Sequence, residues 1–189
     1  MTSATLSLPA RITSFPVVLR PFAPADAPRV AELCGDWEVA QMTAVIAHPY
    51  LPGLAEAWIA THAQEHDVGT AWNYAITRAD DGLLVGAIEL FNRPDASDSF
   101  GYWIGRPFWG MGYATAACRA IVALAFTRQD RDELHATHLA RNPASGRVME
   151  KCGMTLARHE RKPHRRGPVE DFCVWSITRE RWSTLRGTA

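Results

Sequence analysis

The segment from Gly101 to Thr115 has the residue types and spacing of a phosphate-binding turn. It reads G-Y-W-I-G-R-P-F-W-G-M-G-Y-A-T, which predicts a strand, a turn carrying Gly110 and Gly112, and the first turn of a helix. Glycines leave main-chain N–H groups uncovered at a helix N-terminus, where the helix dipole is positive. Such a turn can hold a pyrophosphate without any basic side chain. The segment therefore suggests a cofactor that carries phosphate groups.

Strands and helices on both sides must position this turn. Before it, apolar spacing predicts a strand at 17–22, helices at 24–33 and 54–65, and strands at 72–77, 83–91 and 99–104 with turns at 80–82 and 92–97. After it, the pattern predicts an apolar helix at 114–126, a strand at 133–139, a helix from Asn142 to Gly153, and strands at 154–157 and 172–177. Short turns favour an antiparallel meander, so we expect an α+β domain around one central sheet. Residues 1–14 are expected to be a loose lead-in, and 15–189 a single domain.

Composition and charge argue against several classes of protein. The chain has 189 residues, with 20 Lys and Arg balanced by 20 Asp and Glu, so it lacks the basic surplus that nucleic-acid coating requires. Its N-terminus has no basic region or long apolar run typical of a signal peptide, and no segment approaches the roughly 20 apolar residues of a membrane span. Four dispersed cysteines without C-x-x-C spacing are expected to be reduced thiols. We therefore expect a cytoplasmic protein that binds neither nucleic acid nor a membrane.

Four landmarks, in their order and spacing, resemble one protein family. They are H-P-Y at 48–50, the glycine segment described above, A-R-N-P-A-S-G-R-V-M-E-K-C-G-M at 140–154, and E-D-F-C-V-W-S-I-T-R-E-R-W at 170–182. Together they resemble the GNAT superfamily of acyl-CoA N-acyltransferases, and within it the branch that contains the ribosomal-protein N-terminal acetyltransferases. The resemblance covers about residues 15–182. It implies a single GNAT-type domain whose mostly antiparallel, mixed central sheet is flanked by helices.

The resemblance also implies acetyl-CoA as the cofactor. In the family pattern the main-chain N–H groups of residues 111–115 take the pyrophosphate, although Trp109 stands where the broad pattern has Gln or Arg. The strand carrying Trp103 and Ile104 splays from the strand at 133–139, which leaves a gap for the pantetheine arm and an N–H near Ile104 for the thioester oxygen. Asn142 is expected to contact the arm, and Arg147 a phosphate. The candidate cofactor-binding residues are Trp103, Ile104, Trp109, Gly110, Met111, Gly112, Tyr113, Ala114, Thr115, Asn142, Ser145 and Arg147.

The leaving thiolate needs a proton donor. Many members of the superfamily place a tyrosine in the helix after the second motif, but here that position holds Met149, which cannot donate a proton. In the resembling branch a serine three residues after the asparagine has this role, and Ser145 occupies that place after Asn142. Ser145 is therefore a candidate catalytic residue. The alternative is that Ser145 caps the helix or packs against the arm.

The attacking amine must lose a proton. The branch can use a glutamate that corresponds to Ser99 here, which is no base at neutral pH, and strand alternation turns the adjacent Asp98 to the other face. Glu89 interrupts an apolar strand and is the candidate catalytic carboxylate, since burial would raise its pKa. Alternatively Glu89 has a structural role. A dedicated base is dispensable for an α-amino group, whose reference pKa is about 7.7 to 8.0.

Several features leave the acceptor and the assembly open. The first hypothesis is transfer to the α-amino group of a protein or peptide; the others are transfer to a small amine, such as an antibiotic or polyamine, and a non-catalytic CoA sensor. The basic run at 158–166 is expected to be a solvated hairpin loop or, alternatively, to attract an acidic acceptor. His62 and His66 have metal-ligand spacing, but no third ligand is apparent, so no metal is expected. Dimers are common among similar proteins, which leaves a homodimer open.

Overall fold

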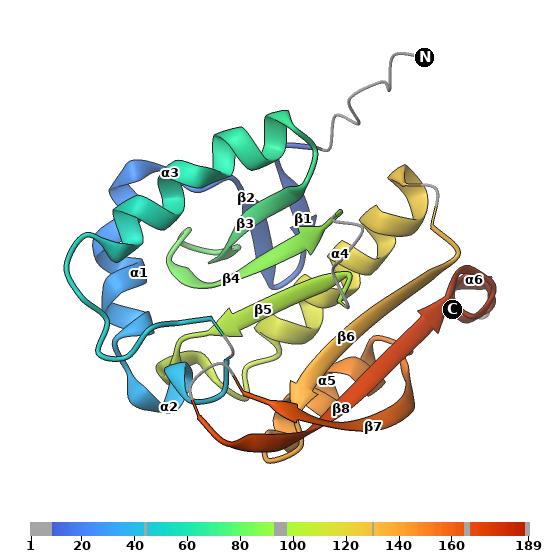
Figure 1. The fold of residues 1–189 in the computed structure, drawn as a ribbon. Helices are drawn as coiled ribbons and strands as arrows, with labels where there is room; N and C mark the ends of the chain where they lie inside the picture. The colour runs from blue at the N-terminus through green and yellow to red at the C-terminus, as the bar shows by residue number, and fades with distance from the viewer. Residues whose placement is uncertain (1–8, 44, 93–97, 130, 165–166, 188–189) are drawn as a thin grey trace.

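The strands form two antiparallel sheets (Figure 1). The computed structural model describes residues 9–43, 45–92, 98–129, 131–164 and 167–187. In the five-stranded sheet the order is β1 (Ile12–Ser14), β2 (Val17–Arg20), β3 (Ala71–Arg78), β4 (Leu84–Phe91) and β5 (Phe100–Ile104). In the three-stranded sheet β8 (Val169–Thr178) lies between β6 (Glu133–Leu139) and β7 (Thr155–Pro163).

Helices cover both faces of the five-stranded sheet (Figure 1). On one face lie α1 (Ala27–Cys34), α2 (Trp37–Ala40) and α3 (Leu54–Asp67), and on the opposite face lies α4 (Tyr113–Arg128). Helix α5 (Pro143–Lys151) packs against α4 and β6, and α6 (Arg179–Gly187) follows β8 directly. Single turns of 3-10 helix, Pro24–Asp26 and Arg106–Phe108, precede α1 and follow β5. The expected α+β fold with helices flanking a mostly antiparallel sheet is confirmed.

The central strands are buried on both faces, which explains their long apolar runs. In β4, Ile88 and Leu90 face the core shared with α4, while Leu84 packs into the core beneath α1 and α3. Helix α4 is apolar on most sides because it lies between this sheet and α5, and its Ala117 and Ile121 are fully buried. The glycine turn is therefore anchored to a helix that cannot move without opening the core.

Strands β5 and β6 are joined at one end. There the N–H of Ser99 donates to the carbonyl of His135 at 2.7 Å, and the N–H of His135 donates to Ser99 Oγ at 3.0 Å. Farther along, the described residues of β5 and β6 belong to different sheets. The expected single sheet is thus divided into two parts. Part of the reason is that the indole N–H of Trp109 donates to the carbonyl of Ile104 at 2.7 Å. This hydrogen bond gives a main-chain acceptor at the free edge of β5 a partner without β6.

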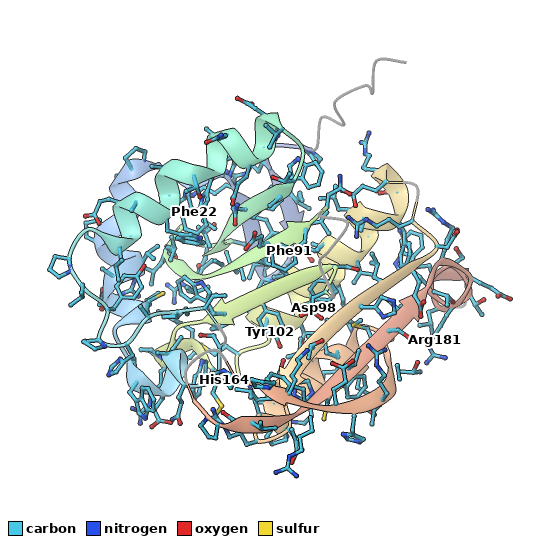
Figure 2. The ribbon with its side chains drawn as sticks, in the orientation of Figure 1. Phe22, Phe91, Asp98, Tyr102, His164 and Arg181 are labelled. Atoms are coloured by element: carbon cyan, nitrogen blue, oxygen red, sulfur yellow. The ribbon has the colours of Figure 1, made fainter. Side chains whose placement is uncertain are left out.

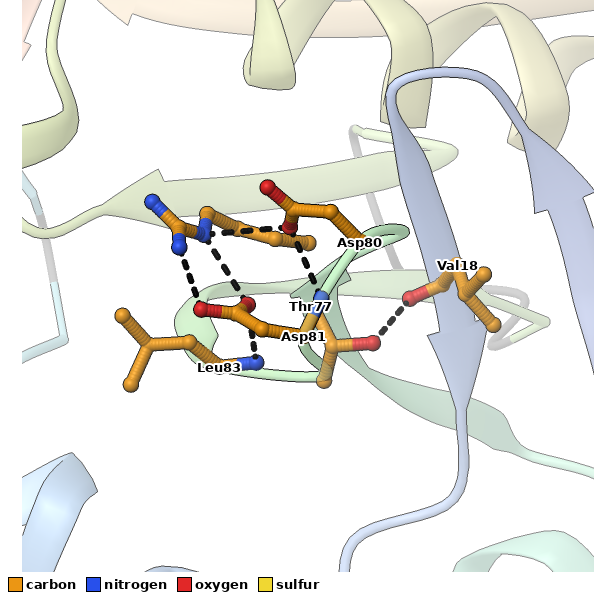
Figure 3. A network of polar contacts seen from close by, with 6 residues as sticks. Val18, Thr77, Asp80, Asp81 and Leu83 are labelled. Atoms are coloured by element: carbon orange, nitrogen blue, oxygen red, sulfur yellow. Dashed lines mark hydrogen bonds and ion pairs between the residues drawn. The ribbon is translucent and has the colours of Figure 1, made fainter.

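The predicted turn between β3 and β4 is confirmed (Figure 3). Arg78 and Asp81 form an ion pair across the turn, and Asp81 also accepts the N–H of Leu83 at 3.0 Å. Thr77, beside a bulge in β3, donates its hydroxyl to the carbonyl of Val18 at 2.9 Å. These contacts fix the register between β2, β3 and β4, and through β4 the position of β5.

The structure differs from the sequence-based expectation in four places. Residues 12–14, expected in the lead-in, form β1; α2 and α6 were not expected; and residues 158–163, expected in a loop, belong to β7. Of the predicted turn at 92–97, residues 93–97 lie outside the described part of the chain, as do residues 165–166 of the basic run. The start of β7 was predicted, but its residues 158–163 escape prediction because this edge strand is exposed along most of its length and shows no apolar alternation there.

Candidate functional site

A cavity of about 1110 Å³ opens where β5 and β6 diverge. Its walls come from β4, β5, the glycine turn, the start of α4, β6, α5 and the segment from α1 to α3. Among the predicted site residues, the following line it: Glu89, Trp103, Ile104, Trp109, Gly110, Gly112, Tyr113, Ala114, Thr115, Asn142, Ser145 and Arg147. The structure thus brings together two motifs that are about 30 residues apart in the chain.

The glycine turn presents main-chain donors to this cavity. Gly110 and Gly112 have φ of 78° and 83°, a left-handed conformation that other residues rarely adopt. Gly112 is the N-cap of α4, and the first intrahelical bond runs from Ala116 N–H to its carbonyl at 3.0 Å. The N–H groups of Tyr113 and its two successors therefore lack intrahelical partners. A Cβ on either glycine would meet no atom within 4 Å, so the turn opens onto empty space.

Two residues of the turn have other surroundings. Trp109 keeps its indole N–H on the Ile104 carbonyl and leaves 45% of its surface exposed. Met111 is 54% exposed and does not line the cavity. The side chain of Met111 therefore contributes nothing to the site, although its main-chain N–H lies within the turn.

The edge of β5 directs donors toward β6. Phe91 N–H bonds to the carbonyl of Ser99 and Gly105 N–H to the carbonyl of Val85, both at 2.8 Å, so odd-numbered residues of β5 pair with β4. Because main-chain groups alternate along a strand, the N–H groups of Tyr102 and Ile104 point into the gap. The side chain of Trp103 instead packs on the side of α1 and α3.

Helix α5 contributes the side chains that face β5. Asn142 is its N-cap, with Oδ1 accepting the N–H of Ser145 at 3.3 Å. Ser145 is therefore not the cap, and its buried hydroxyl lies 2.8 Å from the hydroxyl of Tyr102. Met149 is buried one turn farther along, and Arg147 is exposed at the cavity. The reading of Ser145 as the helix cap is wrong, and its roles as a catalytic residue or as a residue that packs against the arm stay predictions.

Tyr102 is a functional candidate that the sequence reasoning missed. It lies in the gap between β5 and β6 (Figure 2). Burial raises the pKa of its phenol above the ordinary value, so the group stays protonated. Strand alternation could have placed Tyr102 on the same face as Phe100 and Ile104, but nothing in the sequence indicated Ser145 as its partner.

Three carboxylates line the cavity: Glu65, Glu89 and Asp98. Glu89 lies opposite Gly101 in β5 and Asn73 in β3, on the side of the sheet that α3 covers. Asp98 hydrogen-bonds the hydroxyl of Thr137 at 2.5 Å, and burial raises the pKa of its carboxyl. The expectation that Asp98 points away from the site is wrong, because β5 begins at Phe100 and the alternation of the strand does not extend back to it.

Other features bear on what the protein can bind. Among the described residues, no three His, Cys, Asp or Glu side chains are grouped so that they could hold a metal ion. Within the same residues, no helix combines the length and apolar character needed to cross a bilayer. His62 does not face a ligand site; it packs against Phe22 and Trp58 with ring centroids 5.3 and 4.5 Å away.

Comparison with known proteins agrees with this geometry. The family described as "Acetyltransferase (GNAT) domain" matches residues 17–155. The Bacillus subtilis protein named "Putative ribosomal N-acetyltransferase YdaF" is 26% identical over 176 residues, which cover 88% of this chain and 93% of that protein.

Solved structures share the fold. RimL, a ribosomal L7/L12 alpha-N-protein acetyltransferase in complex with coenzyme A, has a TM-score of 0.77 at 18% identity, covering 89% of this chain and 97% of that one. MccE, the microcin C7 self-immunity acetyltransferase in complex with acetyl-CoA and AMP, has a TM-score of 0.78 at 18% identity, covering 92% and 98%. The family match spans most of the chain and includes the glycine turn, β5 and α5. The chain therefore belongs to the GNAT family of acetyltransferases, which are acyl-CoA-dependent N-acyltransferases.

Proposed function

We propose that this protein transfers the acetyl group of acetyl-CoA to the α-amino group of a protein or peptide. The observation that carries the proposal is one continuous cavity that joins the glycine turn, the gap between β5 and β6, and three carboxylates. A cofactor with a diphosphate, an extended arm and a reactive end matches this order of groups. The names of YdaF and RimL, both ribosomal acetyltransferases, support the choice of acceptor.

The residues of the cavity fit the parts of acetyl-CoA. The N–H groups of residues 111–115 would hold the diphosphate at the positive end of α4, and exposed Arg147 would reach a phosphate. The arm would lie between β5 and β6 like an added strand, with the side-chain amide of Asn142 as a further donor. The N–H of Ile104 would then face the thioester oxygen, where negative charge develops during transfer.

Within this arrangement Asp98 is the base that we propose. A neutral amine attacks the thioester carbon, the carbonyl oxygen takes up negative charge, and Asp98 accepts the proton that the nitrogen loses. The raised pKa of Asp98 suits this role because a more basic carboxylate accepts a proton more readily. Glu89 lines the same cavity and is the alternative base.

A small amine is the second candidate acceptor. The observation that favours it is the presence of three carboxylates, Glu65, Glu89 and Asp98, in the cavity wall, since such groups attract a cationic amine. Glu65 is held by the side chain of Asn73, which donates to it at 2.8 Å. A peptide and a polyamine would both meet these groups, so the acceptor must be decided by experiment.

An acceptor screen tests the proposal. The protein is incubated with acetyl-CoA and either peptides with unblocked N-termini, the same peptides with N-acetylated termini, or polyamines and aminoglycosides, and released CoA is measured with a thiol reagent. We expect release with unblocked peptides only, and an acetyl group on the α-nitrogen by mass spectrometry. Release with small amines alone would favour the second candidate, and tight CoA binding without release would favour a sensor.

A further inference from the structure

We propose that Tyr102 is a positioning residue that turns the hydroxyl of Ser145 toward the sulfur of the departing thiolate. This inference rests on the proposed function, since it assigns a role within the transfer of an acetyl group from CoA. The partners belong to separate parts of the fold, because Tyr102 lies in the last strand of the five-stranded sheet and Ser145 in the first turn of α5.

The relative acidity of the two hydroxyls favours Tyr102 as the donor. The two oxygens are 2.8 Å apart, within the range of an O–H···O hydrogen bond. A phenol is a stronger acid than an aliphatic hydroxyl, so the favoured arrangement has Tyr102 donating to Ser145 Oγ. The hydrogen of Ser145 is then directed elsewhere, and the wall of the cavity offers it the space where the thioester would lie. Within the described part of the chain, the hydroxyl of Tyr102 is the hydrogen-bond partner of the Ser145 hydroxyl.

Burial keeps the donor in its protonated form. The pKa of Tyr102 is raised mainly by desolvation, because burial disfavours the phenolate. The phenol therefore holds its proton throughout the reaction and does not pass it on. Ser145, also buried, lies at the N-terminal end of α5, where the dipole favours negative charge on a nearby sulfur.

The chemical step can be written with its protons in balance. When the tetrahedral intermediate collapses, the C–S bond breaks and its electron pair goes to sulfur. The thiolate accepts a hydrogen bond from the hydroxyl of Ser145, whose oxygen in turn accepts one from Tyr102. The thiolate then takes a proton from water as CoA is released. Asp98 returns the proton of the amine to solvent, so no net proton is gained or lost by the protein. The pair lowers the barrier by stabilising the thiolate as it forms.

Kinetics of single and double variants test the pair. We expect Tyr102→Phe, which keeps the ring, to lower kcat about tenfold, the size of effect of losing one hydrogen bond to a charged group. The KM for acetyl-CoA should change less than about twofold. Ser145→Ala should lower kcat at least as much, and the double variant should be no worse than Ser145→Ala. Tyr74→Phe, which removes a hydroxyl bonded to Pro9 away from the cavity, should leave kcat unchanged.

A second measurement does not depend on turnover. The thiol of bound CoA is titrated by the ultraviolet absorbance of its thiolate, in the unchanged protein and in each variant. We expect the thiol pKa to be lowest in the unchanged protein and higher in Tyr102→Phe and Ser145→Ala. Equal thiol pKa values, an unchanged kcat in Tyr102→Phe, or losses that multiply in the double variant would each overturn the pair. Absence of CoA release with every amine would refute the proposed function, while the titration would still decide the role of Tyr102.

Discussion

Asp98 is the residue whose charge state should control the proposed reaction. Its pKa is raised by burial, so as the pH falls through this raised pKa the carboxylate is protonated and can no longer accept a proton. We expect kcat/KM to rise with pH through the raised value, and Asp98→Asn to lose that limb and about 100-fold in kcat. Rate measurements across a pH series check this. If Glu89→Gln removes the limb and Asp98→Asn does not, Glu89 is the base.

Gly112 tests the placement of the diphosphate. Valine at this position would carry its side chain into the open space beside the N–H groups of α4, so CoA affinity should fall at least tenfold, as for a lost charge-assisted hydrogen bond. Gly69→Val is the matched control, since Gly69 also has a positive φ, 69°, and an open surrounding but does not line the cavity. Calorimetric titration with CoA compares the two variants, and equal affinities would refute the placement.

The local part of the site could be predicted from the sequence, and the long-range part could not. Gly110, Gly112 and Ala114 mark the turn because the requirement for positive φ and small side chains is set by neighbouring residues. Tyr102 and Asp98 were missed because their partners, 43 and 39 residues away in the chain, are set by how α5 and β6 pack. Spacing along the chain carries no information about such contacts.

Helix α3 carries a half-buried histidine, His62, that should make stability depend on pH. Burial between Phe22 and Trp58 lowers the pKa of His62 to about 4, and both ring nitrogens are buried without a hydrogen-bond partner among the described residues. In the unfolded chain the reference pKa is about 6.5. As the pH falls from about 6.5 to 4, the unfolded state takes up a proton that the folded state does not, so stability is lost over this window.

A pair of variants on α3 checks this expectation. His62→Leu should keep the packing and reduce the loss of unfolding free energy between about pH 6.5 and pH 4. The remaining pH dependence should include the contribution of His138, whose pKa is also lowered by burial. His66→Leu, on the exposed side of the same helix, should leave the slope as it is. Urea unfolding at several pH values gives the slopes. Equal slopes for His62→Leu and the unchanged protein would contradict the role of His62.

Elements with a buried face could be predicted, and elements without one could not. Helix α4 was expected close to its observed bounds because a long apolar run follows the glycine turn, and strand β6 because its apolar residues alternate. Strand β7 and helix α6 have few buried residues, and their positions come from pairing with β8 and from the end of that strand. Such elements depend on a neighbour that local pattern does not reveal.

Over the whole molecule, the hydrogen bonds between Ser99 and His135 join the two sheets at one end. Ser99→Ala would leave the N–H of His135 without its side-chain acceptor, so the free energy of unfolding should fall by about 1 to 3 kcal/mol. Ser183→Ala, on exposed α6, should change it by less than about 0.5 kcal/mol. Urea unfolding at neutral pH measures both. A neutral Ser99→Ala would mean that the sheets are held together elsewhere.

The bond between Trp109 and Ile104 has a consequence for how thioesters are chosen. This hydrogen bond connects the glycine turn to the end of β5, whose N–H at Ile104 is proposed to face the reacting carbonyl. The distance between the proposed diphosphate site and the proposed thioester site is therefore set before the donor binds. We therefore expect the protein to select donors by the distance between their diphosphate and their thioester. We expect slow reaction when the acyl group is on a shorter or longer carrier, or on pantetheine without the diphosphate. Such a donor could enter the cavity, but its thioester would not be aligned with the amine.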